Sequence, residues 1–315
     1  MKKPSSFAAG TIIHRGGFTL QKRQVRLAWL MLVPALAVLI FVALYPLVRT
    51  IYSSFTDEQF LGGTTHVVGF ANYYNIFTNN TNTAASYPDF AAATILTLKF
   101  TVWSVVIEFL LGLGIALVLN SQFKGRGGMR AAMLVPWAIP TVVSAQMWKW
   151  MFNDISGVVN DFLMKIHVLS APQSWLADPS TSLAAVVAVD VWKTTPFVAL
   201  LLLAGLQVIP TDIYEAAAVD GATGIQKLWR ITLPLLRPAI AVTLIFRTLD
   251  AIRVFDIFNV FFGSTIGKLT MATAIQNTIV SNNEVGYGAA LSVVMFVIIA
   301  IFVVVYTTVF KVEQQ

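Results

Sequence analysis

Seven ionisable residues interrupt long apolar stretches of this sequence, and six of them form pairs at helical spacing. Arg247 and Asp250 lie three residues apart, which places them on one helix face with Ala251 and Val254. Ionisable groups within apolar sequence usually pair with each other or line a water-filled cavity. The pattern therefore predicts either ties between helices or a polar pathway. The remaining residues of this kind are Glu108, Asp190 with Lys193, and Arg253 with Asp256.

Both interpretations have a chemical basis. A charge held away from water needs an opposite charge nearby, so we expect the lone Glu108 to pair with a Lys or Arg of another apolar stretch. In the second interpretation the polar groups bind a solute. Carboxylates, amides and arginine suit a solute rich in hydroxyl groups, because such groups donate and accept hydrogen bonds together, and aromatic rings pack on C–H surfaces.

The composition indicates what must hold these residues in place. Of 315 residues, 57% are hydrophobic and 11% charged, whereas soluble proteins average about 25% charged residues. This balance excludes an ordinary cytosolic protein, a disordered chain and a nucleic-acid binder, and indicates a lipid environment. We predict an all-α membrane protein with six transmembrane helices. The expected spans are residues 27–48, 100–122, 131–148, 183–207, 238–262 and 286–310.

The distribution of Lys and Arg gives the orientation of the spans. Six basic residues precede the first span, and the loops after the second and fourth spans carry three each. The opposite loops contain three in total. Because cytoplasmic loops are enriched in Lys and Arg, both termini are predicted to be cytoplasmic. The first span is too long for a signal peptide, so we expect it to remain as an anchor.

No pattern indicates catalysis or a bound cofactor. The nucleotide-binding pattern G-x-x-x-x-G-K-[ST] is missing, and residues 263–268 only approach it. Cys is absent, the three His residues lie outside the expected spans, and no nucleophile–base pair or metal-ligand set is evident. We therefore predict no catalytic residues and no metal site in this chain, and expect ATP and Mg²⁺ to be bound by a partner.

The loop between the fourth and fifth spans, residues 208–237, carries more local signals than a connector needs. Asp212 and Glu215 have the spacing of a capping box, and Gly221 is placed to end the short helix in a left-handed conformation. A second short helix is expected over residues 223–230. The small alanines of the first helix would let another surface approach closely, although an amphipathic linker lying at the membrane surface is the alternative.

The same loop matches the pattern E-A-A-x3-G-x9-I-x-L-P at every fixed position. The matching residues are Glu215, Ala216, Ala217, Gly221, Ile231, Leu233 and Pro234. The loop resembles the EAA loop in the integral permease subunits of ATP-binding-cassette (ABC) importers. Residues 136–140, 190–197, 206–210 and 286–292 resemble the carbohydrate-uptake branch, which includes the maltose and trehalose permeases. The resemblance covers residues 25–312; the loop after the fifth span departs from the family's Gly-rich sequence.

This resemblance implies a type I ABC importer permease fold with a cytoplasmic coupling helix. It implies a cytoplasmic tail, residues 1–26, and a transmembrane domain, residues 27–312. The implied partners are a second homologous permease subunit, a cytoplasmic ATPase dimer, an extracytoplasmic solute-binding protein and membrane lipid. The implied location is the plasma (inner) membrane of a bacterium or archaeon. The residues implied to contact the ATPase are Tyr214, Glu215, Ala216, Ala217, Asp220, Gly221, Ala222, Ile231, Leu233 and Pro234.

The resemblance also assigns a solute pathway to the fourth and fifth spans. The matching positions are Thr194, Phe197, Arg247, Ala251 and Val254, with Asp250 on the same face. The other intramembrane charges, Glu108, Asp190, Lys193, Arg253 and Asp256, are expected to be structural. The expected solute is a sugar, such as the disaccharides trehalose and maltose. Two alternatives remain. One is a permease for another polar solute such as glycerol phosphate. The other is a proton-coupled secondary transporter, but the sequence shows no inverted repeat of the kind such transporters often contain.

Overall fold

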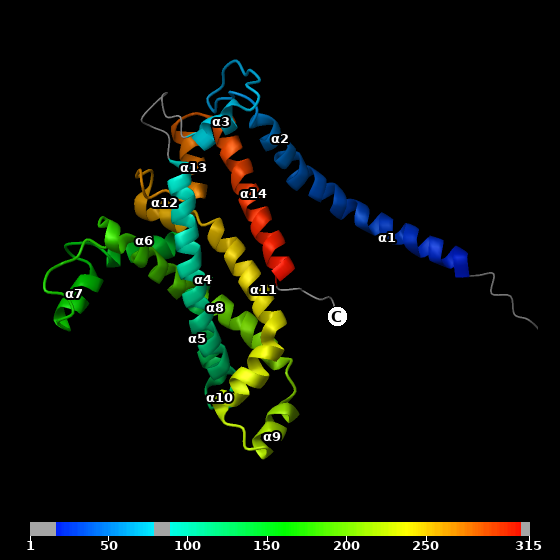
Figure 1. Ribbon diagram of the computed structural model, residues 1–315, viewed down its shortest axis with the longest axis vertical. Helices are drawn as coiled ribbons and strands as arrows, with labels where there is room; N and C mark the ends of the chain where they lie inside the picture. Colours follow the sequence, from blue (N-terminus) through cyan, green and yellow to red (C-terminus); the bar gives the residue numbers. More distant parts are fainter. Residues whose placement is uncertain (1–16, 79–88, 310–315) are drawn as a thin grey trace, which may run out of the picture. The chain divides into compact units, whose positions relative to one another are not determined.

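The computed structural model describes residues 17–78 and 89–309, and the regular structure in these ranges is almost entirely helical (Figure 1). Three π-helical turns, Ile40–Leu44, Leu228–Thr232 and Asn277–Ser281, adjoin the α-helices. The expected all-α class is confirmed. The α-helices are α1 (Gly17–Leu39), α2 (Tyr45–Ser53), α3 (Ala71–Thr78), α4 (Phe90–Asn120), α5 (Arg126–Ala138), α6 (Thr141–Met151), α7 (Val158–Lys165), α8 (Pro179–Gln207), α9 (Thr211–Val219), α10 (Gly224–Lys227), α11 (Leu233–Ile252), α12 (Asp256–Phe262), α13 (Met271–Gln276) and α14 (Val285–Val309).

The described residues contain five helical stretches long and apolar enough to cross a bilayer, or six if one bent pair is counted as a span. The bent pair is α5 and α6, which meet at 88°. Ile139, between them, is extended (φ −73°, ψ 132°), because a residue before proline disfavours the helical conformation. The third expected span therefore exists only as this broken pair. The five stretches are Gln24–Ser53, Phe90–Asn120, Pro179–Gln207, Gly224–Phe262 and Val285–Thr308.

The chain divides into two compact units after Tyr52. In the described part of the first unit, α1 continues through a π-helical turn into α2, and the side chains of the span from Gln24 onward lie outside any core. The turn ends two residues before Pro46. A proline ring clashes with the carbonyl four residues earlier in an α-helix, and a widened turn relieves that clash. The polar cluster at residues 79–82 lies outside the described residues.

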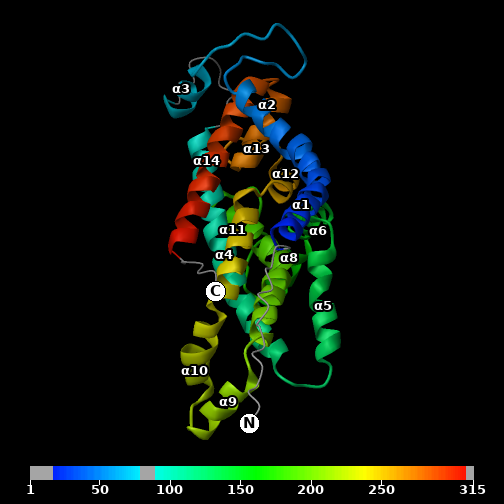
Figure 2. The same cartoon turned by 90° about the vertical axis from the view of Figure 1, so that its right-hand side faces the viewer.

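Helices α4, α8 and α11 form the centre of the second unit and lie side by side in both views (Figures 1 and 2). Two glycines allow their backbones to approach. A Cβ atom on Gly112 of α4 would lie 2.7 Å from Cγ1 of Val198 in α8, and one on Gly205 of α8 would lie 2.4 Å from Cβ of Ala239 in α11. Small residues at crossings are typical of packed membrane helices.

Helix α11 is the upper part of a longer helical rod. α10, the π-helical turn Leu228–Thr232 and α11 follow each other without a break, so the rod runs from Gly224 to Ile252. As before Pro46, the π-helical turn ends two residues before a proline, here Pro234. The short helix expected over residues 223–230 and the span expected from residue 238 are therefore parts of one continuous helix, because the wide turn accommodates Pro234.

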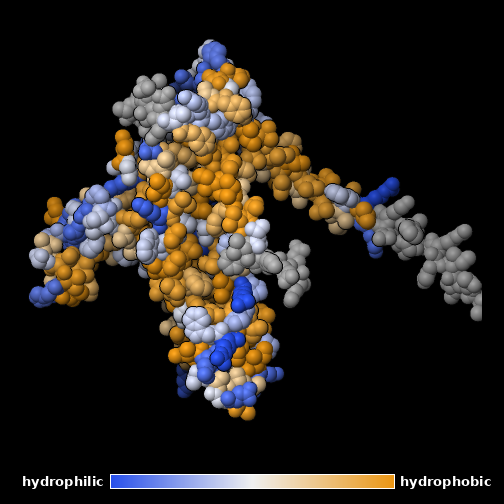
Figure 3. Space-filling view, viewed as in Figure 1, coloured by the Kyte–Doolittle hydropathy of each residue, from blue (hydrophilic) through white to orange (hydrophobic). Residues whose placement is uncertain are grey.

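Two interactions hold the start of α8, which is the end of that helix remote from α9. The Asp178 carboxylate accepts a hydrogen bond from the Ser180 N–H (2.8 Å), and this bond lowers the pKa of Asp178 below its usual value. The Lys268 ammonium donates to the Ala177 carbonyl (2.9 Å). In Figure 3, apolar residues cover most of the visible surface along α4, α11 and α14, and polar residues gather at the end formed by α9 and α10.

Candidate functional site

The EAA loop, residues 208–237, opens with α9. Pro210 is its N-cap residue, and no side-chain hydrogen bond caps the helix. The capping box expected from Asp212 and Glu215 is therefore wrong: α9 already begins at Thr211, so Asp212 lies inside the first turn rather than at the cap. An acidic residue in a first turn still interacts favourably with the helix dipole.

The other end of α9 forms as expected from the sequence. Gly221 has φ +77°, in the left-handed region. Its N–H donates to the Ala218 carbonyl (3.1 Å), and the N–H of Ala222 donates to the Ala217 carbonyl (2.9 Å). These two bonds are those of a Schellman motif, which needs a left-handed residue at this position and so favours glycine.

The second short helix of the loop is fastened to the first. Thr223 and Gln226 form a reciprocal capping box at the start of α10, with hydrogen bonds of 3.3 and 2.8 Å. At the base of the loop, the Tyr214 hydroxyl lies 3.1 Å from Oγ1 of Thr232. The two helices therefore form a closed hairpin on the end of the rod that continues as α11.

The hairpin exposes both acidic and apolar side chains. Glu215, Ala216 and Asp220 are exposed on α9 and its cap. Val219 is 89% exposed, and Ile225 and Trp229 are also exposed. Exposed apolar residues that cluster with polar ones mark interaction surfaces. Gly221 is also exposed, and the other residues of the motif are half-buried: Tyr214, Ala217, Ala222, Ile231, Leu233 and Pro234.

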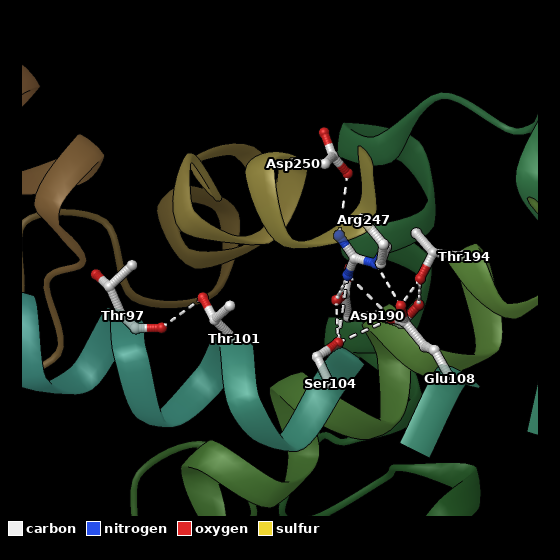
Figure 4. Close-up of polar contacts among 8 residues, drawn as sticks. All are labelled: Thr97, Thr101, Ser104, Glu108, Asp190, Thr194, Arg247 and Asp250. Atoms are coloured by element: carbon white, nitrogen blue, oxygen red, sulfur yellow. Dashed lines mark hydrogen bonds and ion pairs between the residues drawn. The ribbon is translucent and has the colours of Figure 1, made fainter. Parts of the chain in front are cut away.

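A buried group of charges lies further along the same rod, at the junction of α4, α8 and α11 (Figure 4). We call Ser104, Glu108, Asp190 and Arg247 the Arg247 cluster. The Arg247 side chain is 2% exposed. Its guanidinium forms ion pairs with the carboxylates of Glu108 and Asp190, and Nη2 also donates to Ser104 Oγ (3.3 Å). One cation thus joins three helices.

Further hydrogen bonds complete the Arg247 cluster. Ser104 Oγ donates to Oε1 of Glu108 (2.8 Å) and also bonds the Asp190 carboxylate. Thr194 Oγ1 donates to Oε1 of Glu108 (2.5 Å). On the open side, Nη1 of Arg247 donates to Oδ2 of Asp250 (3.1 Å), whose side chain is 72% exposed. The carboxylates that pair with Arg247 therefore grade from Glu108, which is fully buried, through Asp190 to the exposed Asp250.

That cavity has a volume of about 150 Å³ and lies beside the Arg247 cluster. Both charge signs line it, together with hydroxyl groups, so its wall can donate and accept hydrogen bonds. The lining residues are Thr141, Asp190, Lys193, Thr194, Arg247, Asp250, Ala251, Arg253, Val254, Phe255, Asp256 and Ile257. An arrangement of this kind suits an uncharged polar solute better than an apolar one.

Comparison with known proteins identifies the family. The family model described as binding-protein-dependent transport system inner membrane component matches residues 108–311. This chain belongs to that family.

Curated relatives cover almost the whole chain. It is 40% identical to the trehalose/maltose transport system permease protein MalF of Thermococcus litoralis, over 91% of this chain and 94% of the relative. It is 38% identical to the sulfoquinovosyl glycerol transport system permease protein SmoG of Agrobacterium fabrum, over 91% of each chain. It is 34% identical to the trehalose transport system permease protein SugA of Mycobacterium tuberculosis, over 96% and 94%.

A solved structure gives the fold of the permease. One chain in the crystal structure of a bacterial ABC transporter involved in the import of the acidic polysaccharide alginate matches with a TM-score of 0.80. The match covers 95% of this chain and 99% of that one, at 22% identity. The chain therefore has the type I ABC importer permease fold, and the resemblance seen in the EAA loop is confirmed at the level of family and fold.

The structure brings five of the six residues assigned to the permease's solute pathway to the cavity: Thr194, Arg247, Asp250, Ala251 and Val254. Phe197 does not line it. Its ring stacks on Trp137 of α5, with centroids 5.9 Å apart and an interplanar angle of 12°. Arg247 borders the cavity but its guanidinium is occupied by carboxylates. The expected tie between Glu108 and a basic residue of another span is present.

Two expected ion pairs are wrong among the described residues. The Lys193 ammonium donates to the Ile139 carbonyl (2.6 Å) rather than pairing with Asp190, because the bend before Pro140 leaves helix-end carbonyls without their usual donors. Arg253 donates from Nε to the Leu249 carbonyl (3.1 Å). It is the C-cap of α11, whereas Asp256 begins α12, so the two do not share a helix.

The sequence analysis singled out Glu108 but missed the polar residues that share its face of α4. Four buried polar residues, Thr97, Thr101, Ser104 and Glu108, lie on one face of α4 at helical spacing. Thr97 accepts the Met271 N–H (3.0 Å), and Ser104 belongs to the Arg247 cluster. The signal was available, because these positions follow i, i+4, i+7 and i+11, but hydroxyl residues are common in membrane helices and carry little information individually.

Proposed function

We propose that this permease, together with a second homologous permease subunit, forms the membrane pathway of an ATP-driven importer for a sugar, a disaccharide such as trehalose or maltose. The names and coverage of the relatives support the sugar assignment, since two of the three described above carry trehalose in their names. The exposed hairpin of the EAA loop carries the proposal of ATP-driven transport. A proton-coupled mechanism lacks comparable support, because the family's description is of transport that depends on a binding protein.

The hairpin is proposed to dock on a cytoplasmic ATPase. Glu215 and Asp220 offer negative charge, and Val219, Ile225 and Trp229 offer an apolar surface that would otherwise face water. A groove that is basic at its rim and apolar at its base fits this combination. The Schellman ending at Gly221 and the Tyr214–Thr232 contact hold the hairpin in one shape, so that little conformational entropy is lost on docking.

The helical rod from Gly224 to Ile252 is proposed to carry motion from the ATPase to the solute pathway. Its lower end lies in the EAA loop and its upper end carries Arg247 and Asp250. The Arg247 cluster fastens the rod to α4 and α8. Closure of an ATPase dimer that displaced the hairpin would then move three helices as one body, in keeping with a rigid-body change between inward- and outward-open forms.

The cavity beside the Arg247 cluster is proposed to be one half of the solute site. Its volume of about 150 Å³ is below the 300–1,000 Å³ typical of pockets that enclose drug-sized ligands. A second permease subunit facing it would supply the remaining wall. The exposed groups of Asp250, Arg253 and Asp256 would bond to hydroxyl groups. A solute-binding protein on the outer face would deliver the sugar, as the name of the family implies for its members.

Reconstitution tests this proposal. The complex that assembles around the tagged permease is purified from its native membrane and placed in liposomes with ATP enclosed. We expect an ATPase and a second permease to co-purify, and labelled trehalose or maltose to accumulate only when ATP and the binding protein are present. Uptake by the permease alone, or uptake abolished by an uncoupler and unaffected by ATP, would contradict it.

A matched pair of variants tests the docking role. Glu215→Lys reverses an exposed charge in the motif, and Asp212→Lys reverses an exposed charge one turn earlier on α9. We expect the first to release the ATPase during purification and the second to retain it. An intact complex after Glu215→Lys would remove Glu215 from the proposed contact.

A further inference from the structure

Helix α7 exposes large apolar residues on one face. Val158 and Phe162, and Ile166 directly after the helix, lie on this face and are all exposed, Phe162 by 59%, while Asn160 on the opposite face is buried. Val159, Leu163 and Met164 are half-buried. Ile155, just before the helix, is 95% exposed. An exposed row of apolar residues marks an interaction surface.

The orientation of α7 is fixed by the contacts of Asn160 and by the close packing at Gly157. The Asn160 side chain donates to the carbonyls of Asp154 (3.1 Å) and Gln173 (3.0 Å), and its Oδ1 accepts the Trp175 indole N–H (2.8 Å). Directly before the helix, a Cβ on Gly157 would lie 2.3 Å from the Asn153 carbonyl oxygen. Rotation of α7 to bury its exposed apolar face would break all of these hydrogen bonds. The hydrogen bonds therefore hold that face outward.

We propose that this face of α7 lies in the interfacial region of the lipid leaflet opposite the EAA loop. The chain gives the side: α7 precedes the first residue of α8, and the EAA loop follows its last residue, so one membrane span separates the two. A helix with an apolar face and adjacent charged residues is typical of such a position. The charged flank is the exposed ion pair of Asp161 with Lys165 (2.7 Å).

A second row of exposed apolar residues lies on α6, the helix that precedes α7 in the chain. Val143, Met147 and Trp150 are exposed at helical spacing along α6, which is half of the bent span. Trp150 ends this row two residues before the loop that leads into α7, and tryptophan is enriched where membranes meet water. Lipid would then cover both rows, and α7 would brace the outer ends of α6 and α8 against the membrane.

Spin labelling tests this inference directly, because the chain contains no cysteine and single cysteines can be introduced without background. Phe162→Cys and Val158→Cys report on the apolar face, and Asp161→Cys, adjacent in sequence, reports on the charged flank. Each labelled permease is assembled in its complex and placed in liposomes of phosphatidylcholine and phosphatidylglycerol. Collisions with oxygen, which concentrates in lipid, are compared with collisions with a water-soluble nickel chelate.

We expect the ratio of oxygen to nickel collisions to be several-fold higher at positions 162 and 158 than at position 161. A ratio at both apolar positions equal to that at 161 would place the face in water and overturn the proposal. Labels shielded from both reagents, and released when the solute-binding protein or the second permease is removed, would identify a protein interface instead and overturn it equally. If the Phe162→Cys variant does not fold, the Val158→Cys variant alone tests the proposal.

Discussion

The Arg247 cluster and the EAA loop hold their charged residues in opposite ways. Glu108, Asp190 and Arg247 are buried, and each side chain bonds at least two others. Glu215 and Asp220 of the EAA loop are exposed at the end of a hairpin. Buried ions lose hydration and need every partner in place, whereas exposed charges contribute little to folding. The first set therefore belongs to the fold, and the second is available to another protein.

The two regions lie on one helical rod, Gly224 to Ile252. A rod that is free at one end and pinned at the other transmits displacement, provided that the pinned end does not yield. The contrast in burial thus has a mechanical consequence: substitutions at the pinned end should unfold or loosen the permease, and substitutions at the free end should uncouple it while leaving it folded.

The largest expected effect comes from Arg247→Ala. Removal of the guanidinium leaves the buried carboxylates of Glu108 and Asp190 without their cation, and loss of one partner from a buried pair costs about 3–5 kcal/mol of the free energy of unfolding. Thermal unfolding followed by fluorescence in detergent measures the loss. The control is Arg253→Ala, an exposed arginine at the end of the same helix, which should change stability by less than about 0.5 kcal/mol. Equal losses in the two variants would contradict the special role of the cluster.

The second prediction concerns coupling to the ATPase, with stability unchanged. Glu215→Lys should reduce ATP-dependent uptake to background and leave the free energy of unfolding within about 0.5 kcal/mol of the parent, because the residue is exposed. Asp212→Lys carries the same charge change on the same helix and should retain most uptake. Unfolding temperature and uptake are measured on the same preparations. A destabilised Glu215→Lys protein would show that the loop supports the fold and would erase the contrast with Arg247.

Sequence reasoning succeeded here where the signal was local. The helix end at Gly221 follows from one glycine and the alanines before it, and the Arg247–Asp250 contact follows from helical spacing. It failed where a distant element decided the partner. Lys193 lies three residues from Asp190, yet the bend before Pro140 brings the Ile139 carbonyl to its ammonium, and Asp190 pairs with Arg247 of another helix. Spacing within one helix cannot reveal such competition.

The boundaries of helices caused the other errors. The pairing of Arg253 with Asp256 assumed that α11 continues past Ile252, but the chain leaves the helix at Arg253. Conversely, a short helix ending at residue 230 and a span beginning at residue 238 were expected where the rod is continuous, because a π-helical turn accommodates Pro234. In both regions the backbone, rather than the residue types, determined which side chains could meet.

The third prediction concerns the shape of the hairpin. Gly221 has φ +77° and a Cβ atom there would have no atom within 4 Å, so Gly221→Ala introduces backbone strain without a clash. A left-handed conformation costs a residue with a side chain about 1–2 kcal/mol. Gly221→Asn should lose less, because asparagine tolerates this region. Uptake should fall in the same order as stability in detergent; equal behaviour of the two variants would show that the Schellman ending is dispensable.

A small effect on stability is expected for Asp250→Asn, beside the Arg247 cluster. Asp250 shares Arg247 with Glu108 and Asp190, but its side chain is 72% exposed, and exposed ion pairs contribute about 0–1 kcal/mol. If its carboxylate contacts solute in the cavity, KM for sugar uptake should rise while the maximal rate changes little, because the contact would contribute to binding rather than to motion. Asp161→Asn, whose carboxylate is paired with Lys165 on α7, controls for loss of an exposed charge elsewhere. A reduced maximal rate at unchanged KM would instead show that Asp250 belongs to the pinned end of the rod. The residues that hold the rod in place would then extend further along α11 than Arg247.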